Sequence, residues 1–537
     1  MRTIFAVFVL ASIVTACSST QSVPGSQAVS PPTPKVPSVE TGPEVALYQA
    51  HCASCHGPDR LGGTGPALLP VSLGRSKAAD VSEVIANGRP ATQMPAFKET
   101  LTPEQIQSLA QYVFQPPKQD PSWQDEEIAA SLKVESGWEG WPGKAKFKAD
   151  PLNIFMVVEA GDHHITVLDG DTYKSLHRFP TRYALHGGIK YTADGRYAFF
   201  ASRDGWITSY DLYNLKQVAE VRAGINTRNI AVSADGRYVA VGNYLPHTVA
   251  ILKAPSLELV KVLKAENIRG ESSRVSAVYT APPRESFIVA LKDIPEVWEV
   301  SYRDDAVAPF TGLVHDFRTE SGEEIPQEKV PFPIRRISLE DPLDDFFFNQ
   351  KYDHLVGASR SGEAWVVNLI VGRPIKKIAL SGMPHLGAGI SWTYKGKRVM
   401  ASPNLKENKI TILDTENWEV IKDIPTQGPG FFLRSHENSP YAWADVFFGP
   451  NKDLIHVIDK KKLTIRKTLK PVPGKVSGHV EFDRRGKYVL LSIWEDPGEL
   501  LIYDAKTLKV RKRIPMRKPS GKYNVYNKTR LSEGTSH

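Results

Sequence analysis

From about residue 140 onward, apolar and polar positions alternate in short runs that are typical of β-strands. The runs are rich in Val, Ile, Tyr and Phe, and turns such as Asp-Gly, Asn-Lys and Pro-Gly separate them. One unit, Tyr191–Tyr197, recurs as Val232–Tyr238 and more loosely as Phe482–Tyr488. Because the runs have a period of two, a helical solenoid is unfavourable, and we expect an all-β domain over residues 141–537.

The repeats have a regular length. An apolar strand in each unit ends at a recurring position, often an Asp, and these positions are residues 169, 211, 253, 299, 368, 414, 459 and 504. The spacing is 42 residues between the first two and 45 between each of the last three. A period of about 40–45 residues with several strands per unit predicts a β-propeller. We count eight blades, with an insertion around residues 303–335 and a seven-bladed ring as the alternative.

The pattern before residue 117 is helical. Val45–Tyr48 begins a first helix, and Thr102–Val113 forms the last one. Thr102 is a suitable N-cap because Pro103 follows in the first turn and Gln105 completes a capping box. We therefore expect an α + β multidomain protein in which a small all-α domain at residues 44–116 precedes the propeller, with residues 117–140 as a linker.

The helical domain contains a haem-attachment motif, Cys52-Ala53-Ser54-Cys55-His56. Two thiols three residues apart can form thioethers with haem vinyl groups, and the His then supplies an axial imidazole. A zinc site would need more Cys or His nearby, and a redox dithiol would not need the His. The segment Gly88–Phe97 resembles the Met-Pro loop of class I cytochromes c, which makes Met94 the second axial ligand. The sequence predicts one covalently bound haem c.

Composition excludes several classes of protein. The chain has 537 residues, 41% of them hydrophobic, so it can bury a large core. Three Cys are an odd number, which excludes a disulfide scaffold. The net charge is +8, but Lys and Arg are scattered and no nucleic-acid-binding motif is present. We therefore expect no nucleic-acid partner.

The N-terminus predicts export. Met1–Ala16 has one positive charge, an apolar run too short to span a bilayer, and small residues before Cys17. Val14–Cys17 resembles the lipobox of bacterial lipoproteins, so Cys17 is the candidate acylation site and residues 17–43 are a flexible tether. An ordinary signal peptide, removed together with Cys17, is the alternative. Both place the mature protein in the periplasm, and the first makes it a membrane-anchored lipoprotein.

A cytochrome c domain followed by an eight-bladed propeller resembles the cytochrome cd1 family. The segment that contains His186 resembles the strand that supplies the proximal iron ligand to haem d1. Arg203, Arg228 and Tyr244 resemble positions that contact the acidic side chains of haem d1. The terminal segment Ser520–Asn527 resembles the one that closes the propeller in this family. The resemblance implies that haem d1 or dihydro-haem d1 binds to the propeller.

Departures from the family indicate a different reaction from nitrite reduction. The reductases use two distal His residues, but the corresponding segments here, Thr280–Ser286 and Ser338–Pro342, contain none. Glu340 would repel nitrite, and Ala388 stands where the reductases have an Arg. His479, in contrast, resembles a position of the branch described as dihydro-haem d1 dehydrogenases.

That resemblance implies an oxidoreductase that oxidises a propionate of the tetrapyrrole to an acrylate, with haem c as electron acceptor. His479 would be a base or an iron ligand with a pKa near neutrality, and Tyr526 or Tyr523 would position the reacting side chain. The implied partners are periplasmic electron-transfer proteins, other proteins of haem d1 biosynthesis and the nitrite reductase. Two alternatives remain open: a cytochrome cd1 nitrite reductase with altered distal chemistry, and a non-enzymatic carrier of the d1 precursor or electron-transfer lipoprotein. His385 and His436 are expected to be structural.

Overall fold

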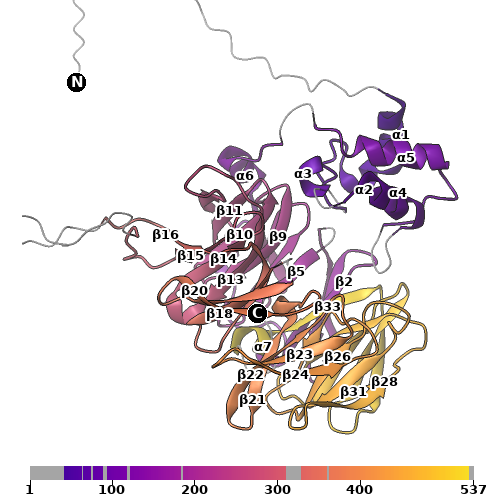
Figure 1. Ribbon diagram of the computed structural model, residues 1–537, viewed down its shortest axis with the longest axis vertical. Coiled ribbons are helices and arrows are strands. Elements are labelled where there is room, and N and C mark those ends of the chain that lie inside the picture. Colours follow the sequence, from indigo (N-terminus) through magenta and orange to yellow (C-terminus); the bar gives the residue numbers. More distant parts are fainter. Residues whose placement is uncertain are drawn as a thin grey trace, which may run out of the picture. The chain divides into compact units, whose positions relative to one another are not determined.

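The computed structural model describes residues 42–62, 65–73, 76–88, 94–117, 121–182, 185–309, 328–359 and 362–530 (Figure 1). Cys17 and the expected signal peptide lie outside these residues. The described residues before position 117 form five helices: α1 (Pro43–His51), α2 (Ala53–His56), α3 (Pro70–Leu73), α4 (Ala78–Asn87) and α5 (Pro103–Tyr112).

The helical domain is held together by an apolar cluster around the contact between α1 and α5. The rings of Tyr48 and Tyr112 meet edge to face with their centroids 5.5 Å apart. Helix α5 begins as the sequence predicts: the Thr102 hydroxyl accepts from the Gln105 backbone N–H at 3.3 Å, and the side-chain amide oxygen of Gln105 accepts from the Thr102 backbone N–H at 2.9 Å. This reciprocal capping satisfies two N–H groups that would otherwise lack partners at the start of the helix.

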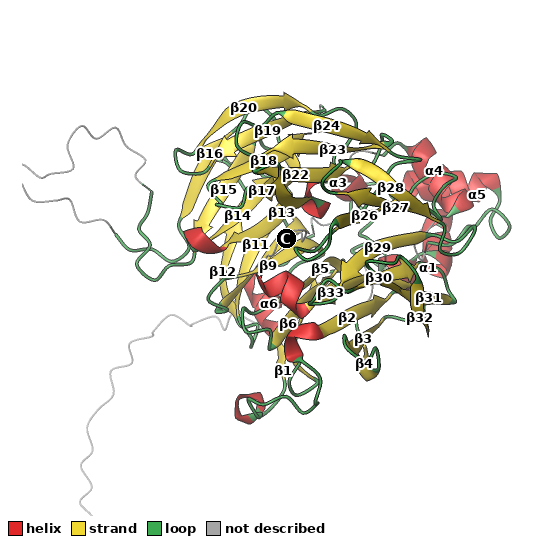
Figure 2. Cartoon of the chain, turned by 90° about the horizontal axis from the view of Figure 1, so that it is seen from below, coloured by secondary structure: helices red, strands yellow, loops and turns green. Residues whose placement is uncertain are grey.

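The described strands form eight sheets, which follow one another in a ring (Figure 2). The first sheet, from its innermost strand outward, has β33 (Pro519–Asn524), β2 (Ile154–Glu159), β3 (His164–Asp169) and β4 (Ser175–Pro180). The second has β5 (Leu185–Tyr191), β6 (Tyr197–Ser202), β7 (Trp206–Asp211), β8 (Lys216–Arg222) and β1 (Lys133–Val134). The third has β9 (Asn226–Val232), β10 (Tyr238–Leu245), β11 (Thr248–Lys253) and β12 (Leu259–Lys264). The fourth has β13 (Val275–Ala281), β14 (Ser286–Leu291), β15 (Glu296–Ser301) and β16 (Ile334–Ser338).

The other four sheets have the same order from the centre outward. The fifth has β17 (Leu343–Phe348), β18 (His354–Ser359), β19 (Glu363–Asn368) and β20 (Arg373–Ala379). The sixth has β21 (Ile390–Tyr394), β22 (Lys397–Pro403), β23 (Lys409–Asp414) and β24 (Val420–Pro425). The seventh has β25 (Leu433–Arg434), β26 (Tyr441–Asp445), β27 (Ile455–Asp459) and β28 (Thr464–Leu469). The eighth has β29 (Ser477–Phe482), β30 (Tyr488–Ile493), β31 (Gly498–Asp504) and β32 (Val510–Met516), and helix α7 (Val525–Arg530) follows β33.

Burial explains the strand sequences. A middle strand such as β2 packs against neighbouring sheets on both faces, and all six of its residues are buried. An outer strand such as β20 alternates between exposed and more buried positions. The expectation of eight blades is therefore confirmed, and the repeating positions from 169 to 504 all lie in the third strand of a sheet.

Two features depart from the expected organisation. The region expected to be a linker contains helix α6 (Asp125–Ser131) and strand β1, and β1 adds a fifth strand to the second sheet through pairs such as Lys133 with Glu220. An edge strand has unpaired backbone N–H and C=O groups, and an extended segment can form hydrogen bonds with them. The expected insertion lies between β15 and β16, and residues 310–327 of it are outside the described part.

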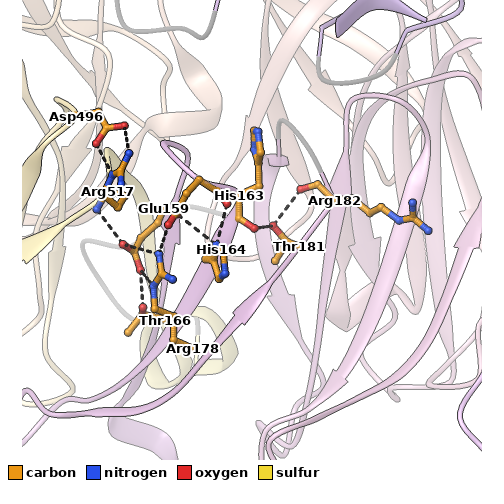
Figure 3. Close-up of polar contacts among 10 residues, drawn as sticks. Glu159, His163, His164, Thr166, Arg178, Thr181, Arg182, Asp496 and Arg517 are labelled. Carbon is orange, nitrogen blue, oxygen red and sulfur yellow. Dashed lines mark hydrogen bonds and ion pairs between the residues drawn. The ribbon is translucent and has the colours of Figure 1, made fainter. Parts of the chain in front are cut away.

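The C-terminal strand closes the ring, because β33 pairs with β2 and so joins the two ends of the propeller. A polar network reinforces this seam (Figure 3). The buried Glu159 carboxylate accepts from the Thr166 hydroxyl at 2.6 Å, from Arg178 Nε at 2.9 Å and from the Arg517 N–H at 2.9 Å. The Arg517 side chain in turn pairs with Asp496 of the eighth blade at 2.6 Å.

Candidate functional site

The helical domain holds the residues of the haem motif in a geometry that fits a c-type haem. The His56 N–H donates to the Cys52 carbonyl at 2.9 Å, so one helical turn places both half-buried Cys on the same side. The Met94 side chain packs against the apolar cluster that Cys52 also contacts. The structure thus brings Met94 and the first Cys of the motif to one apolar cluster, although Arg89–Gln93 of the Met loop lie outside the described residues.

The surroundings of His56 favour a neutral imidazole that can bind iron through Nε2. Its ring is 7% exposed, and burial lowers the pKa of its imidazole, which favours the neutral form. Its Nδ1 lies 2.8 Å from the Pro66 carbonyl, so Nδ1 carries the proton and Nε2 is left for a metal. Gly65 permits this close packing, since a Cβ at this position would lie 2.6 Å from Nδ1.

In the propeller, three of the predicted tetrapyrrole-binding residues form one electrostatic group. Burial and the neighbouring Arg228 lower the pKa of Arg203 to about 10. The pKa of Tyr244 is lowered in spite of its burial, because Arg228 and Lys292 favour the phenolate. The Lys292 ammonium lies 5.2 Å from the centroid of the Tyr244 ring and donates to Asp344 at 2.8 Å. A ligand with several carboxylates would find complementary charge here.

His186 has its backbone in β5, where it pairs with Ala201 just before an irregularity in the ladder. Its side chain lies outside the described part of the structure, so its role as the proximal iron ligand stays a prediction.

His479 lies in the innermost strand of the eighth blade, where its side chain is 2% exposed. Its φ of 50° is in the left-handed region, which is unusual for a residue other than Gly. Burial, followed by the positive charges of Lys522 and Arg434, moves the pKa of His479 well below its usual value. This corrects the expectation of a pKa near neutrality: the imidazole is neutral in this environment.

The hydrogen bonds of His479 also define its tautomer. The Lys522 N–H donates to Nδ1 at 3.3 Å, so Nδ1 is the acceptor and Nε2 carries the proton. A neutral imidazole in this tautomer offers a donor at Nε2. It can take up a proton only at Nδ1, after the bond from Lys522 is broken, which argues against a simple role as base.

The structure separates the two candidate tyrosines. The Tyr523 ring lies 5.3 Å from the His479 ring at an interplanar angle of 75°, and burial raises the pKa of Tyr523 to about 12, so its phenol is protonated. The Tyr526 hydroxyl instead donates to Glu437 at 3.2 Å, and its ring faces His436 at 6.5 Å. Tyr526 therefore belongs to a different group of residues from His479.

His385 is a candidate site residue that the sequence did not reveal, because its local context predicted only a structural role. Its ring lies 6.4 Å from Phe432, and Phe432 lies 4.5 Å from His479, so the two histidines flank one aromatic side chain. Burial lowers the pKa of His385. The bond of 2.7 Å from Nδ1 to the Phe431 carbonyl places the proton on Nδ1. Its Nε2 therefore presents a lone pair, suited to a proton or to iron.

The structure also shows three cationic residues that the sequence analysis did not single out: Lys190, Arg434 and Lys528. Burial and the charge of Arg434 lower the pKa of Lys190 to about 8 and move that of Lys528 well below its usual value. Arg434 is 4% exposed, its Nε has no hydrogen-bond partner, and the nearest Glu481 oxygen is 3.9 Å away. Single Lys and Arg residues scattered over distant blades give no local signal, which is why the sequence did not reveal them.

The segment Thr280–Ser286, whose lack of His argued against nitrite reduction, does not lie beside His479. Thr280–Ser286 spans the end of β13 and the turn after it, whereas His479 is the third residue of its inner strand β29. Arg284 in this segment donates to Glu299 at 2.7 Å. The absence of His from Thr280–Ser286 therefore says nothing about the residues around His479.

Comparison with known proteins assigns the fold and site to a class. Residues 149–319 and 327–528 match the cytochrome D1 heme domain, and residues 43–113 match the family of cytochrome c oxidase, cbb3-type, subunit III. The chain therefore belongs to the cytochrome D1 heme domain family.

Within this class, the chain is 52% identical over 496 residues to the dihydro-heme d1 dehydrogenase of Pseudomonas aeruginosa, covering 92% of this chain and 96% of that protein. A solved structure of dihydro-heme d1 dehydrogenase NirN in complex with DHE matches with a TM-score of 0.78 and 51% identity over 91% of this chain and 100% of that one. The nitrite reductase of Stutzerimonas stutzeri is more distant, at 26% identity over 92% of this chain and 94% of that protein.

Proposed function

We propose that this protein is a haem-c-containing oxidoreductase that converts a propionate side chain of dihydro-haem d1 into an acrylate. The observation that carries the proposal is the buried, neutral pair of His479 and Tyr523 among cationic side chains, in a chain that also has a cytochrome c domain. Its similarity to a dihydro-heme d1 dehydrogenase over nearly the whole chain supports the same substrate.

The electron balance explains the fusion of the two domains. Converting –CH2–CH2– to –CH=CH– breaks two C–H bonds and releases two electrons and two protons. A haem c bound through Cys52, Cys55 and His56 supplies a one-electron acceptor. Two electrons therefore leave in succession. The second one needs either reoxidation of this haem c by an external acceptor before it leaves, or the oxidised haem c of a second protein molecule.

The protonation states of the side chains indicate the role of each one in the reaction. His479 presents Nε2–H and Tyr523 presents its phenolic O–H, so both act as donors to the carboxylate of the reacting side chain. Such donors stabilise the negative charge that develops when the carbon next to a carboxylate loses a proton. The Nε2 lone pair of His385 is the candidate acceptor for that proton, which then passes to solvent. Arg203, Arg228 and Tyr244 bind other carboxylates of the tetrapyrrole and so fix its orientation.

The test mixes the purified oxidised holoprotein with dihydro-haem d1 without oxygen and follows the absorption spectrum. The expected result is the acrylate-bearing product together with reduction of haem c. His479→Ala should remove turnover, whereas His354→Gln, on β18 with its ring bonded to Asp353, should keep it. Tight binding without conversion would identify a carrier, and rapid turnover of nitrite would identify a nitrite reductase. Either result would refute the proposal.

We also propose that the mature protein is a periplasmic lipoprotein acylated at Cys17. The sequence of Met1–Cys17 supports this. No helix in the described part of the chain is long and apolar enough to cross a membrane. Small periplasmic electron-transfer proteins are the expected acceptors, and other haem d1 biosynthesis proteins or the nitrite reductase would receive the product. Metabolic labelling with a fatty acid should mark the wild type and not Cys17→Ala.

A further inference from the structure

The backbone of His479 is left out of the sheet that contains it. In the ladder between β29 and β30, Gly478 pairs with Ser492 and the next pair is Glu481 with Leu490. Two residues, His479 and Val480, therefore face one residue of the partner strand, which is the pattern of a β-bulge. The bulge coincides with the left-handed φ of His479, so the conformation that aims this ring needs support from elsewhere.

Two buried charged side chains provide that support. The Asp445 carboxylate, on β26 of the seventh blade, accepts from the His479 N–H at 3.2 Å. The Lys522 ammonium, on β33, donates to the His479 carbonyl and, at 2.8 Å, to the Ser492 hydroxyl. Asp445 is 1% exposed and Lys522 is fully buried. Both peptide groups that the bulge frees are thus bound by ionisable side chains from neighbouring strands.

The same two residues order the groups around the His479 ring. The other Asp445 oxygen accepts from the N–H groups of Phe431 at 2.7 Å and Phe432 at 2.9 Å. Phe432 packs on the His479 ring, and the Phe431 carbonyl binds Nδ1 of His385. The Lys522 N–H holds Nδ1 of His479, and the next residue, Tyr523, packs against its ring.

We propose that Asp445 and Lys522 are positioning residues for the reaction: they hold His479 in its left-handed conformation, with Nε2–H directed at the substrate. They act through the peptide groups of His479 and through the aromatic residues beside it. The kinetic test of this positioning role rests on the proposed function, because it measures turnover of dihydro-haem d1. The structural test, which compares the conformation of residue 479 in crystal structures, does not depend on that function. A buried Lys and a buried Asp are unfavourable where an apolar residue would fill the same space, which is consistent with a role beyond packing.

The test uses two variants that keep shape and remove charge, Asp445→Asn and Lys522→Met, as full-length holoproteins. Lys506→Met, an exposed Lys in the turn before β32, is the matched control. The expected kinetic result is a fall in kcat of about tenfold or more, because a displacement of about 1 Å at a reacting group has effects of this size. The dissociation constant for dihydro-haem d1 should change by less than about threefold, since Arg203, Arg228 and Tyr244, which bind its other carboxylates, are intact.

Crystal structures of the two variants give a readout that does not depend on turnover. We expect φ of residue 479 to leave the left-handed region in at least one variant, and its ring to move away from Tyr523. If both folded variants keep His479 in place, or keep kcat within twofold of Lys506→Met, the proposal is wrong. If only one variant folds, that variant decides the question. Absence of turnover in the wild type would refute the proposed function, while the crystal structures would still decide the positioning role.

Discussion

The left-handed backbone of His479 leads to a prediction about stability. At this position Gly should be more stable than Ala, which is the reverse of their order at an ordinary strand position. We compare His479→Gly with His479→Ala. Both variants lose the imidazole and its contacts with Phe432 and Tyr523, so these losses cancel in the comparison. What remains is the backbone: an L-residue with a Cβ is less favourable by about 1–2 kcal/mol in the left-handed region, and Gly is not.

At an ordinary strand position the order is the opposite, because Gly is less stable than Ala by roughly 0.5–1 kcal/mol. The matched control is therefore Val510→Gly against Val510→Ala, since Val510 is 39% exposed on the outer strand β32 and has no positive φ. We expect Gly to be the more stable residue at 479 by about 1 kcal/mol and the less stable one at 510.

The assay is thermal unfolding of the propeller, followed by calorimetry on the four variants. Unfolding entropy is about 2.1 cal/mol/K per residue, so for roughly 370 residues between Ile154 and Asn524 it is about 0.8 kcal/mol/K. A difference of about 1 kcal/mol then shifts the Tm by about 1 °C, which repeated scans resolve. If His479→Ala melts at or above His479→Gly while the control pair behaves as expected, the backbone at 479 is not strained and the argument fails.

Three further results are expected. Met94→Ala should lower the reduction potential of haem c in a redox titration, because a Met ligand raises it; an unchanged potential would exclude Met94 as the ligand. Arg228→Gln should weaken binding of dihydro-haem d1 by about tenfold or more in a spectral titration, since a charge-assisted contact contributes about 1.5–3 kcal/mol; equal affinity would remove Arg228 from the site. Burial lowers the pKa of His456 to about 4, so its contribution to stability is present above pH 6.5 and lost as the pH falls towards 4. Unfolding of His456→Gln should therefore depend less on pH in that window, and an identical dependence would show that His456 titrates normally.

Several parts of the molecule follow from local sequence. The Cys52–His56 motif and the capping box at Thr102 are each contained in a few consecutive residues, and their geometry is that of one helical turn. The repeat of about 40–45 residues predicts the eight blades because each blade is built from consecutive strands. The resemblance of the last segment to the cytochrome cd1 family anticipated the closing strand β33.

The candidate site was predicted less completely. His479 and Tyr523 come together as the family resemblance implied, whereas Tyr526 lies beside Glu437 and His436. Tyr523 and Tyr526 have similar local contexts, but Tyr523 is in strand β33 and Tyr526 is in helix α7, so their side chains have different surroundings. The pKa of His479 differs from the expectation because burial determines it, together with two cations that are far away in the sequence, Lys522 and Arg434.

The architecture and the chemistry of the haem motif could be predicted from the amino-acid sequence, since both depend on short-range spacing and on periodicity. Only the tertiary structure brought Asp445, Lys522 and His385 to His479, because these residues belong to different blades, or to the closing strand, and no spacing along the chain relates them. The tautomer of His479 and its left-handed backbone are likewise consequences of contacts between strands. The reason is physical: a propeller gathers one inner strand from every blade around one axis, so its site is a property of the closed ring.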